Sequence, residues 1–326
     1  MASLLPAWVA PNLVTFTGFT VALSNIFLFA YFNPTLDQVV PSWMFMYAGF
    51  TVFFYLTMDA IDGMQARKTK SSTPLGQLFD HGCDCMITTV FALMMINGLS
   101  LGPSWKSIAL VACAQVTFFL SQWEEKYTGT CRTSVAGLFG VTEIQLMLMS
   151  QMFASAFYPS LGSMEVYQGW VYSDCFLLGY VGFMVLVDVS CIAGILFKCF
   201  SAFKELLAVL GLNVVVFVWA LRWGLERDEY LLAMLTLAFC NSFSTIRVIL
   251  STITATKFPL YHPVAIPYFA LAIGRVLYGP GPWVQVAFAI YLGGQLDHII
   301  KALVGIVNEI SCYLGIYVFN ISSKRD

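Results

Sequence analysis

The chain alternates between long apolar runs and short polar connections. Ten runs are long enough to cross a hydrocarbon core of about 30 Å. They fall near 12–32, 43–62, 80–98, 104–123, 142–160, 176–198, 203–222, 230–252, 262–278 and 283–303. None shows the alternation of apolar and polar positions that is typical of a strand, and helices satisfy their own backbone polar groups in lipid. The pattern predicts an all-α polytopic integral membrane protein with about ten transmembrane helices.

The composition agrees with a chain whose solvent is lipid. Hydrophobic residues make up 59% of it and charged residues 10%, whereas a soluble domain has about a quarter charged residues. The net charge of −2 gives no basis for a nucleic-acid partner. The nine cysteines lie mostly in apolar runs and are expected to be buried and free of disulfides. We expect one membrane-embedded domain over 1–326, with catalytic helices over about 5–160 and further transmembrane helices over about 161–326.

Two features of the ends of the runs suggest how the chain is inserted. The first residues lack a basic segment followed by a cleavage site, so the run from Asn12 onward is expected to be a retained span. Most lysines and arginines fall in connections that share one side if the N-terminus is cytosolic. This bias predicts a cytosolic side that includes the connection between the second and third spans.

Four acidic residues, among 18 in the chain, lie close together between these two spans. Asp59 and Asp62 are three residues apart, and Asp80 and Asp84 are four apart, so each pair shares one face of a helix. Carboxylates held this close need positive charge beside them, and hard divalent cations with oxygen ligands can supply it. Two such ions about 4 Å apart suit phosphoryl transfer. The alternative is that these are ordinary helix-end carboxylates, either solvated or paired with the basic residues Arg67, Lys68 and Lys70.

The same stretch carries a family resemblance. It reads D-x2-D-G-x2-A-R-x8-G-x3-D-x3-D from Asp59 to Asp84, and it matches the signature of the CDP-alcohol phosphotransferases at eight fixed positions. The flanking segments Trp8-Val-Ala-Pro-Asn12 and Val141-Thr-Glu-Ile-Gln145 are similar to the eukaryotic choline/ethanolamine phosphotransferase branch. The resemblance covers roughly Leu5 to Gln145.

This resemblance implies an enzyme of the endoplasmic reticulum or Golgi with its active site facing the cytosol. It would transfer phosphocholine or phosphoethanolamine from CDP-choline or CDP-ethanolamine to diacylglycerol taken from the membrane lipid, and release CMP. It also implies a homodimer. The four aspartates would hold two Mg²⁺ or Mn²⁺ ions. Other acceptors, namely alkyl-acylglycerol or ceramide, remain open, as do a transporter and a non-catalytic relative.

Further residues of the motif are candidates for the nucleotide site. Arg67 is expected to bind the diphosphate, because a planar guanidinium contacts phosphate oxygens in bidentate fashion. Gly63 and Gly76 would leave room for the nucleotide and its close approach to the backbone. Ala66 belongs to the same motif. Asn12 is either a helix cap or, by resemblance, part of the nucleotide pocket.

The proton acceptor is predicted to be His81, whose side chain titrates near neutral pH and which follows Asp80 directly. Asp84 is the alternative base. Glu143 either complements the dipole of its helix or, by resemblance, orients His81. Trp123, with Tyr127 and Glu124 near it, could form a cradle for an ammonium head group.

Two features of this chain differ from the family pattern. The segment before Trp8 is shorter than is common in the family, so the chain is expected to lack an interfacial helix or to be a shortened form. The head group is not decided by the motifs, because Trp123-Glu-Glu-Lys-Tyr is similar to ethanolamine-type members and Val141-Thr-Glu-Ile-Gln145 to choline-type or dual-specificity ones.

Overall fold

The computed structural model describes residues 5–131, 134–135, 139–199, 202–207, 210–211, 213, 226–258 and 265–321. Within these ranges the long helices are α1 Pro11–Phe32, α2 Ser42–Thr69, α3 Pro74–Gly98, α4 Trp105–Thr128, α5 Val141–Phe157, α6 Tyr172–Lys198, α8 Tyr230–Ile253, α9 Ala265–Tyr278 and α10 Pro282–Leu314. A 3₁₀ turn covers Leu161–Ser163. The strands form two short hairpins, β1 Ser134–Val135 with β2 Phe139–Gly140, and β3 Glu165–Tyr167 with β4 Trp170–Val171. The predicted span at 203–222 falls mostly outside the described residues.

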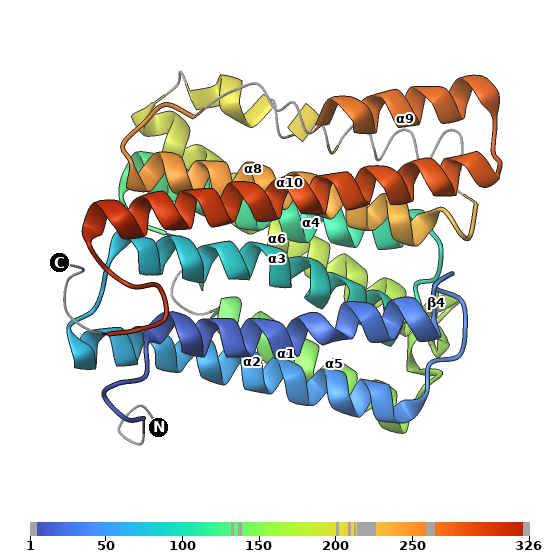
Figure 1. Cartoon of the computed structure of the whole chain (residues 1–326). Helices are drawn as coiled ribbons and strands as arrows, with labels where there is room; N and C mark the ends of the chain where they lie inside the picture. Colours follow the sequence, from blue (N-terminus) through green and yellow to red (C-terminus); the bar gives the residue numbers. More distant parts are fainter. Residues whose placement is uncertain are drawn as a thin grey trace.

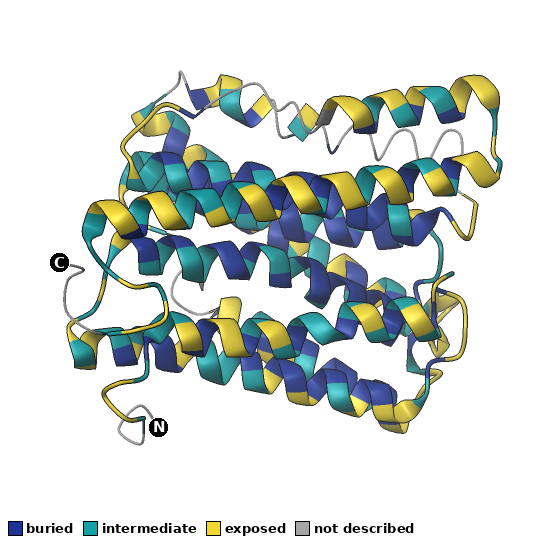
Figure 2. Cartoon of the chain, viewed as in Figure 1, coloured by how far each residue is buried: buried dark blue, intermediate teal, exposed yellow. Residues whose placement is uncertain are grey.

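The helices lie side by side in a bundle (Figure 1). α1 packs on α2 and α3, α5 packs on α2, and α8 packs against α3, α4 and α10. Six helices of the described chain, α1, α2, α3, α6, α8 and α10, are long and apolar enough to cross a membrane. α8 is central, with 83% of its most apolar window buried, whereas the corresponding value for α10 is 11% (Figure 2). The all-α polytopic fold predicted from the sequence is confirmed.

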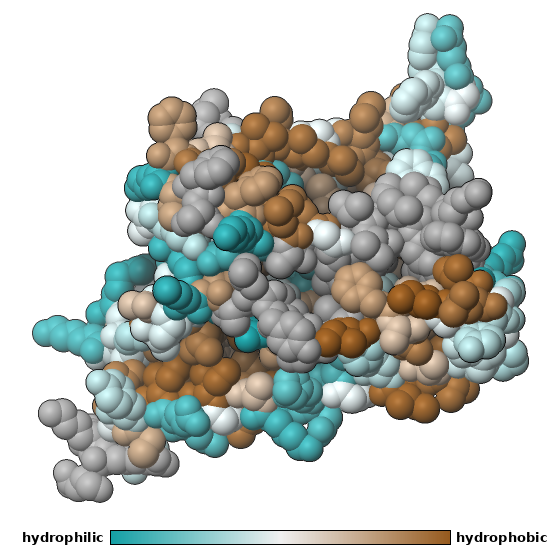
Figure 3. All heavy atoms as spheres, turned by 90° about the horizontal axis from the view of Figure 1, so that it is seen from above, coloured by the Kyte–Doolittle hydropathy of each residue, from teal (hydrophilic) through white to brown (hydrophobic). Residues whose placement is uncertain are grey.

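The outer helices present apolar side chains to their surroundings. Ile273 and Leu277 on α9 and Ile290 on α10 are all more than half exposed, and apolar side chains gather on the surface seen from above (Figure 3). Such exposure would be unfavourable in water, but lipid chains cover it without cost. These observations identify an integral membrane protein.

Two oppositely charged pairs lie in or beside the apolar helices. Arg275 Nε lies 3.2 Å from both carboxylate oxygens of Glu229, and both side chains are buried. Lys301 Nζ lies 2.7 Å from Asp297 Oδ2, one helical turn away. None of the nine cysteines forms a disulfide bond in this structure.

A tight connection between α2 and α3 positions the acidic residues. α2 ends at Thr69, and Lys70 adopts the left-handed conformation with φ of 55°. The N–H of Ser71 donates to the carbonyl of Ala66, which is the bond that closes a Schellman-type helix end. α3 begins at Pro74, where Thr73 Oγ1 accepts from the N–H of Gly76 at 3.1 Å. This four-residue connection places the last turns of α2 beside the first turns of α3.

Candidate active site

The α2–α3 hairpin brings together three of the four predicted carboxylates. Asp59, Asp62 and Asp80 each offer an oxygen, and these oxygens lie within 4.8 Å of one another. Asp62 is buried and accepts a hydrogen bond from Thr15 Oγ1 of α1. The helical spacing within α2 and the connection to α3 together produce this geometry, as the sequence predicted.

Asp84 lies one turn further along α3 than Asp80 and is outside this group of three. Its Oδ1 accepts a hydrogen bond of 2.6 Å from the hydroxyl of Tyr55, which is fully buried in α2. Asp84 and Asp59 nevertheless line the same cavity. The structure therefore places Asp84 beside the carboxylate group, with one oxygen already bound by protein.

The three carboxylates of Asp59, Asp62 and Asp80, which we call the carboxylate group, fit a divalent cation. Asp80 Oδ1 is buried and has no hydrogen-bond partner among the described residues, and none of the described ion pairs includes any of the four aspartates. An uncompensated buried carboxylate is costly, whereas a hard cation with oxygen ligands would satisfy it. The alternative of pairing with Arg67, Lys68 and Lys70 does not occur in this structure, since no ion pair joins them to these carboxylates in the described part of the chain.

A cavity of about 600 Å³ lies on one side of the carboxylates, and we call it the polar cavity because its lining includes two aspartates, a lysine and several serine and threonine residues. It is lined by Asp62 and by small or polar residues from the ends of α1, α2 and α3. Among them are four of the predicted nucleotide-site residues, Asn12, Gly63, Ala66 and Gly76. Arg67 is exposed and is not among the lining residues, but its Nη1 would lie 3.5 Å from a Cβ added at Gly63, which does line the cavity. Five residues near the end of the chain, Ile316, Tyr317, Val318, Asn320 and Ile321, complete the lining.

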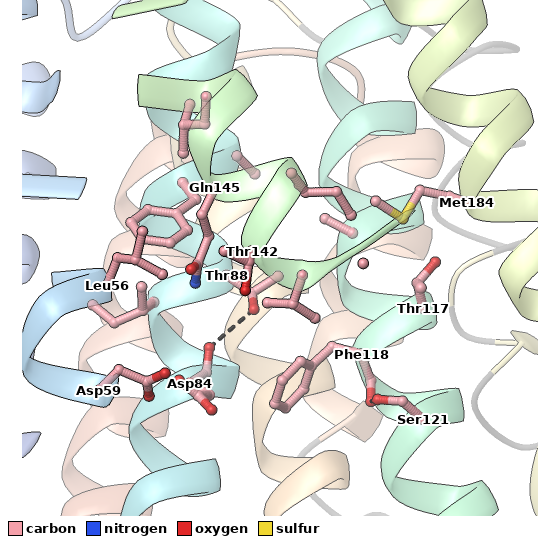
Figure 4. Close-up of a pocket in the computed structure, with 18 of the residues that line it drawn as sticks. Leu56, Asp59, Asp84, Thr88, Thr117, Phe118, Ser121, Thr142, Gln145 and Met184 are labelled. Atoms are coloured by element: carbon pink, nitrogen blue, oxygen red, sulfur yellow. Dashed lines mark hydrogen bonds between the residues drawn. The ribbon is translucent and has the colours of Figure 1, made fainter. Parts of the chain in front are cut away.

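A second cavity of about 480 Å³ lies on the other side and is mainly apolar. Figure 4 shows Asp59 and Asp84 at one end of it, with Thr142 and Gln145 of α5 and Met184 of α6 around it. Thr88 in this wall donates to the backbone carbonyl of Asp84 at 2.9 Å. The remaining lining is dominated by leucine, phenylalanine and other apolar side chains of α3 to α6. Such a cavity suits a lipid more than a nucleotide.

Asp80 is the residue that the two linings share. Asp62 faces the polar cavity, and Asp59 and Asp84 face the apolar one. The carboxylate group therefore lies at the junction of a hollow suited to a polar ligand and a hollow suited to an apolar ligand. A group bound in one cavity could be passed to a molecule bound in the other at this point.

His81 lines the apolar cavity next to this junction. Its Nδ1 lies 3.0 Å from Oε1 of Gln122 in α4 and 3.9 Å from a carboxylate oxygen of Glu125. An amide oxygen only accepts, so Nδ1 carries the proton and Nε2 is the basic nitrogen of the neutral ring. Glu125 is itself held by Gln77 Nε2 at 2.8 Å. The ring is thus oriented by groups on α4 in a way that a general base requires.

Cys131 is another side chain on this cavity that could in principle take part in proton transfer. Burial and the nearby carboxylates of Glu125 and Asp84 raise the pKa of the Cys131 thiol to about 12. The thiol therefore stays protonated at neutral pH, and it accepts a long contact from Gln122 Nε2 at 3.6 Å. This leaves His81 as the better candidate for proton transfer.

Glu143 and Trp123 are placed differently from the other candidates. The carboxylate of Glu143 accepts from the N–H of Gly140 at 2.8 Å at the start of α5, and the residue is not part of either lining. Its role with His81 stays a prediction. The proposed ammonium cradle is wrong for Trp123, because its ring is fully buried and stacked on Phe119, and its Nε1 donates to Glu205 at 2.9 Å.

Several residues of the site were not found from the sequence. Thr15, Tyr55 and Gln122 bind Asp62, Asp84 and His81 respectively, but polar residues within apolar helices give no signal of their partners. Lys70, which the sequence suggests only as a possible partner of the carboxylates, lines the polar cavity. The positive φ of Lys70 follows from its position at the end of α2 and could not be read from its residue type.

Gly63 allows a test of the polar cavity. A Cβ at this position would make only ordinary contact, 3.5 Å from Arg67 Nη1, so Gly63→Ala should fold normally. Because Gly63 faces the cavity, the added methyl group should instead obstruct the expected CDP-alcohol and raise the KM for that substrate about tenfold or more. Steady-state kinetics in nanodiscs would measure this. Gly182→Ala, in an equally open position on α6, is the matched control; an equal effect of both changes would contradict the assignment.

Comparison with known proteins identifies the relatives of this chain. A sequence model described as CDP-alcohol phosphatidyltransferase matches residues 8–197, which is more than half of the chain. The chain is 27% identical over 285 residues to a Dictyostelium discoideum protein named uncharacterized CDP-alcohol phosphatidyltransferase class-I family protein 2, covering 83% of this chain and 67% of that one. It is 26% identical over 352 residues to Homo sapiens ethanolaminephosphotransferase 1, covering 98% and 86%.

A third relative matches over a shorter region. Danio rerio cholinephosphotransferase 1 is 37% identical over 159 residues, which are 47% of this chain and 40% of that protein. The chain therefore aligns with less than half the length of this relative. Relatives named for choline transfer and for ethanolamine transfer both occur among the similar proteins.

Proposed function

The chain belongs to the CDP-alcohol phosphatidyltransferase family, and from this premise we propose that it transfers phosphocholine or phosphoethanolamine from the CDP-alcohol to sn-1,2-diacylglycerol. The family makes the chain a membrane-embedded phosphotransferase of phospholipid biosynthesis. The products would be phosphatidylcholine or phosphatidylethanolamine, and CMP. This reaction is the last step of the CDP-alcohol route to these lipids.

The observation that carries the proposal is the position of Asp80 between a polar and a mainly apolar cavity. The polar cavity would take the CDP-alcohol, with Gly63, Ala66 and Gly76 presenting little or no side chain to it. Lys70 in the lining, and Arg67 beside Gly63, would attract the diphosphate. The apolar cavity would take the upper part of diacylglycerol, whose free hydroxyl would then lie near the carboxylates.

The carboxylates define where the reaction would occur. Asp59, Asp62 and Asp80, with Asp84 beside them, would hold two Mg²⁺ or Mn²⁺ ions. When bound, these ions neutralise charge that develops on the phosphoryl group and on the leaving CMP. Thr15 and Tyr55 fix two of the carboxylates, so their geometry is set before any ligand binds.

His81 would take the proton of the acceptor. As the hydroxyl oxygen of diacylglycerol bonds to the phosphorus that carries the choline or ethanolamine, the bond from that phosphorus to the CMP oxygen breaks. The proton moves to Nε2 of His81, and Gln122 keeps the other ring nitrogen protonated and oriented. The apolar lining would keep water from competing as the acceptor.

The location and assembly of the enzyme form part of the same proposal. The lysine and arginine bias favours a cytosolic face for the α2–α3 connection, where a soluble CDP-alcohol could enter the polar cavity. We propose the endoplasmic reticulum or Golgi as the membrane, and a homodimer as the assembly. Protease accessibility of the 70–73 connection in sealed microsomes would test the orientation.

A reconstituted assay tests the reaction. The purified chain in nanodiscs containing diacylglycerol would receive Mg²⁺ or Mn²⁺ and either CDP-choline or CDP-ethanolamine, and both CMP and labelled lipid would be measured. We expect metal-dependent phospholipid synthesis, and the ratio of the two rates would identify the head group. If product formed only with alkyl-acylglycerol or ceramide, that lipid would replace diacylglycerol as the assigned acceptor. Absence of product with every acceptor would contradict the assigned reaction.

A further inference from the structure

The described chain does not end with its last helix. α10 stops at Leu314, and Gly315 adopts the left-handed conformation with φ of 63°. The N–H of Ile316 donates to the carbonyl of Ser311 at 3.0 Å, which closes the helix end and reverses the chain. The segment 316–321, which we call the C-terminal strap, then runs back toward the start of α1 (Figure 1, red).

Two contacts hold the strap against the N-terminal helices. Asn12 Nδ2 of α1 donates to the backbone carbonyl of Val318 at 3.0 Å. The ring of Phe319 packs between Phe16 of α1 and Phe79 of α3, with centroids 5.7 Å and 5.6 Å away. Asn12 thus joins the strap to a cavity that its own side chain lines. The strap connects elements that are separated by about 300 residues in the sequence.

The strap forms one wall of the polar cavity. Its residues Ile316, Tyr317, Val318, Asn320 and Ile321 face the cavity together with Asp62, Gly63 and Lys70. Phe319 points the other way, into the aromatic contact with Phe16 and Phe79. The strap therefore has one side that would touch a ligand and one aromatic anchor that holds it.

We infer that the C-terminal strap is part of the nucleotide-binding site and retains the bound cytidine nucleotide. This inference rests on the proposed function for the identity of the ligand. A segment that closes over a ligand mainly slows its release, because the segment has to move before the ligand can leave. The anchor suits such movement, since Phe319 is 46% exposed and the strap is only a few residues long.

The anchor residue gives a direct test, because Phe319 supports the strap without lining the cavity. Phe319→Ala should weaken CMP binding about tenfold, mostly through faster release, since it removes the aromatic contact that keeps the strap closed. Calorimetry and stopped-flow measurements on the protein in nanodiscs with Mg²⁺ would give affinity and release rate. Its melting temperature without nucleotide should stay near that of the wild type.

Tyr313→Ala is the matched control. Tyr313 is on the last turn of α10 and 90% exposed, so this change removes an aromatic ring from the same end of the molecule without touching the strap contacts. Its CMP affinity should equal that of the wild type. Unchanged CMP affinity in Phe319→Ala would overturn the inference. Tighter binding would also overturn it, because the strap would then compete with the nucleotide.

A cross-link provides a second readout that does not depend on lipid synthesis. Phe16→Cys combined with Phe319→Cys should form a disulfide on oxidation, which peptide mass spectrometry would locate. With CMP already bound, oxidation should slow its release at least tenfold, and reduction should restore it. Equal release rates in both states would overturn the inference. If CMP is retained in this way but no phospholipid is formed, the strap inference stands and the proposed reaction fails.

Discussion

Replacing Asp80 with asparagine is expected to abolish transfer while leaving the metal-free protein at least as stable as the wild type. Asp80 shares the carboxylate group with Asp59 and Asp62, and its Oδ1 is buried without a partner among the described residues. Removing its charge relieves repulsion between like charges, and asparagine keeps the shape of the side chain. The same change removes a ligand oxygen at the junction of the two cavities.

The expected loss of kcat in Asp80→Asn is roughly 10²–10³-fold or more, because charge stabilisation at the reacting group is among the largest contributions to catalysis. The melting temperature without metal should rise by about 2–4 °C. Mg²⁺ or Mn²⁺ should stabilise the wild type and fail to stabilise the variant. Together, these results would show that Asp80 serves function at a cost in stability.

Asp174→Asn is the control for this experiment. Asp174 is also a helix carboxylate, but it pairs with Lys106 and lies outside both cavities. Transfer and metal stabilisation should be unaffected by its replacement. Full activity of Asp80→Asn, or equal losses in both variants, would contradict a specific role for the carboxylate group.

His81→Ala is expected to lower kcat by about 10²–10⁴-fold while the KM for the CDP-alcohol stays nearly constant. The reason is that His81 lines the apolar cavity, where the acceptor would bind, and is absent from the lining of the polar one. Steady-state kinetics with both substrates varied would separate the two constants. Added imidazole should restore part of the activity if the missing group is a base.

Asp84 is the alternative base, and Asp84→Asn decides between them. One carboxylate oxygen of Asp84 already accepts a hydrogen bond from Tyr55. If Asp84 is not the base, Asp84→Asn should lower the activity, and added imidazole should not restore it. Gln122→Ala should lower kcat by an intermediate factor of about 10–100, because it removes the hydrogen bond that orients the imidazole ring of His81. Near wild-type turnover in His81→Ala would assign the proton transfer to Asp84 instead.

Local patterns in the sequence predicted the elements and the acidic cluster. Their spacing places the acidic residues of each pair, Asp59 with Asp62 and Asp80 with Asp84, on one face of a helix. A short polar connection between two successive helices makes them lie side by side. The apolar runs likewise predicted α1 to α6 and α8 to α10 within a few residues at most ends. These features depend on neighbours within about 25 positions.

The parts that sequence could not predict depend on distant residues. The sequence around Asn12 is compatible with a helix cap or a pocket residue, but the hydrogen bond from Asn12 to Val318 involves a backbone group 306 positions away. Gln122 and His81 meet across two helices, and nothing in either segment indicates the partner. For Trp123 the prediction is wrong in the opposite sense, because an aromatic residue near acidic ones suggests a ligand site, whereas Trp123 is a core residue.

The distance in sequence between the two sides of the polar cavity has a consequence for biosynthesis. The carboxylate group is complete once α1 to α3 have entered the membrane, because its contacts come from residues 15 to 80. The wall formed by residues 316–321 is added only after α10 has been translated. A nascent chain would therefore pass through a stage in which it could already bind metal but could not yet enclose a nucleotide. Catalytic competence would arise late in synthesis, after the C-terminal helices have been inserted and packed.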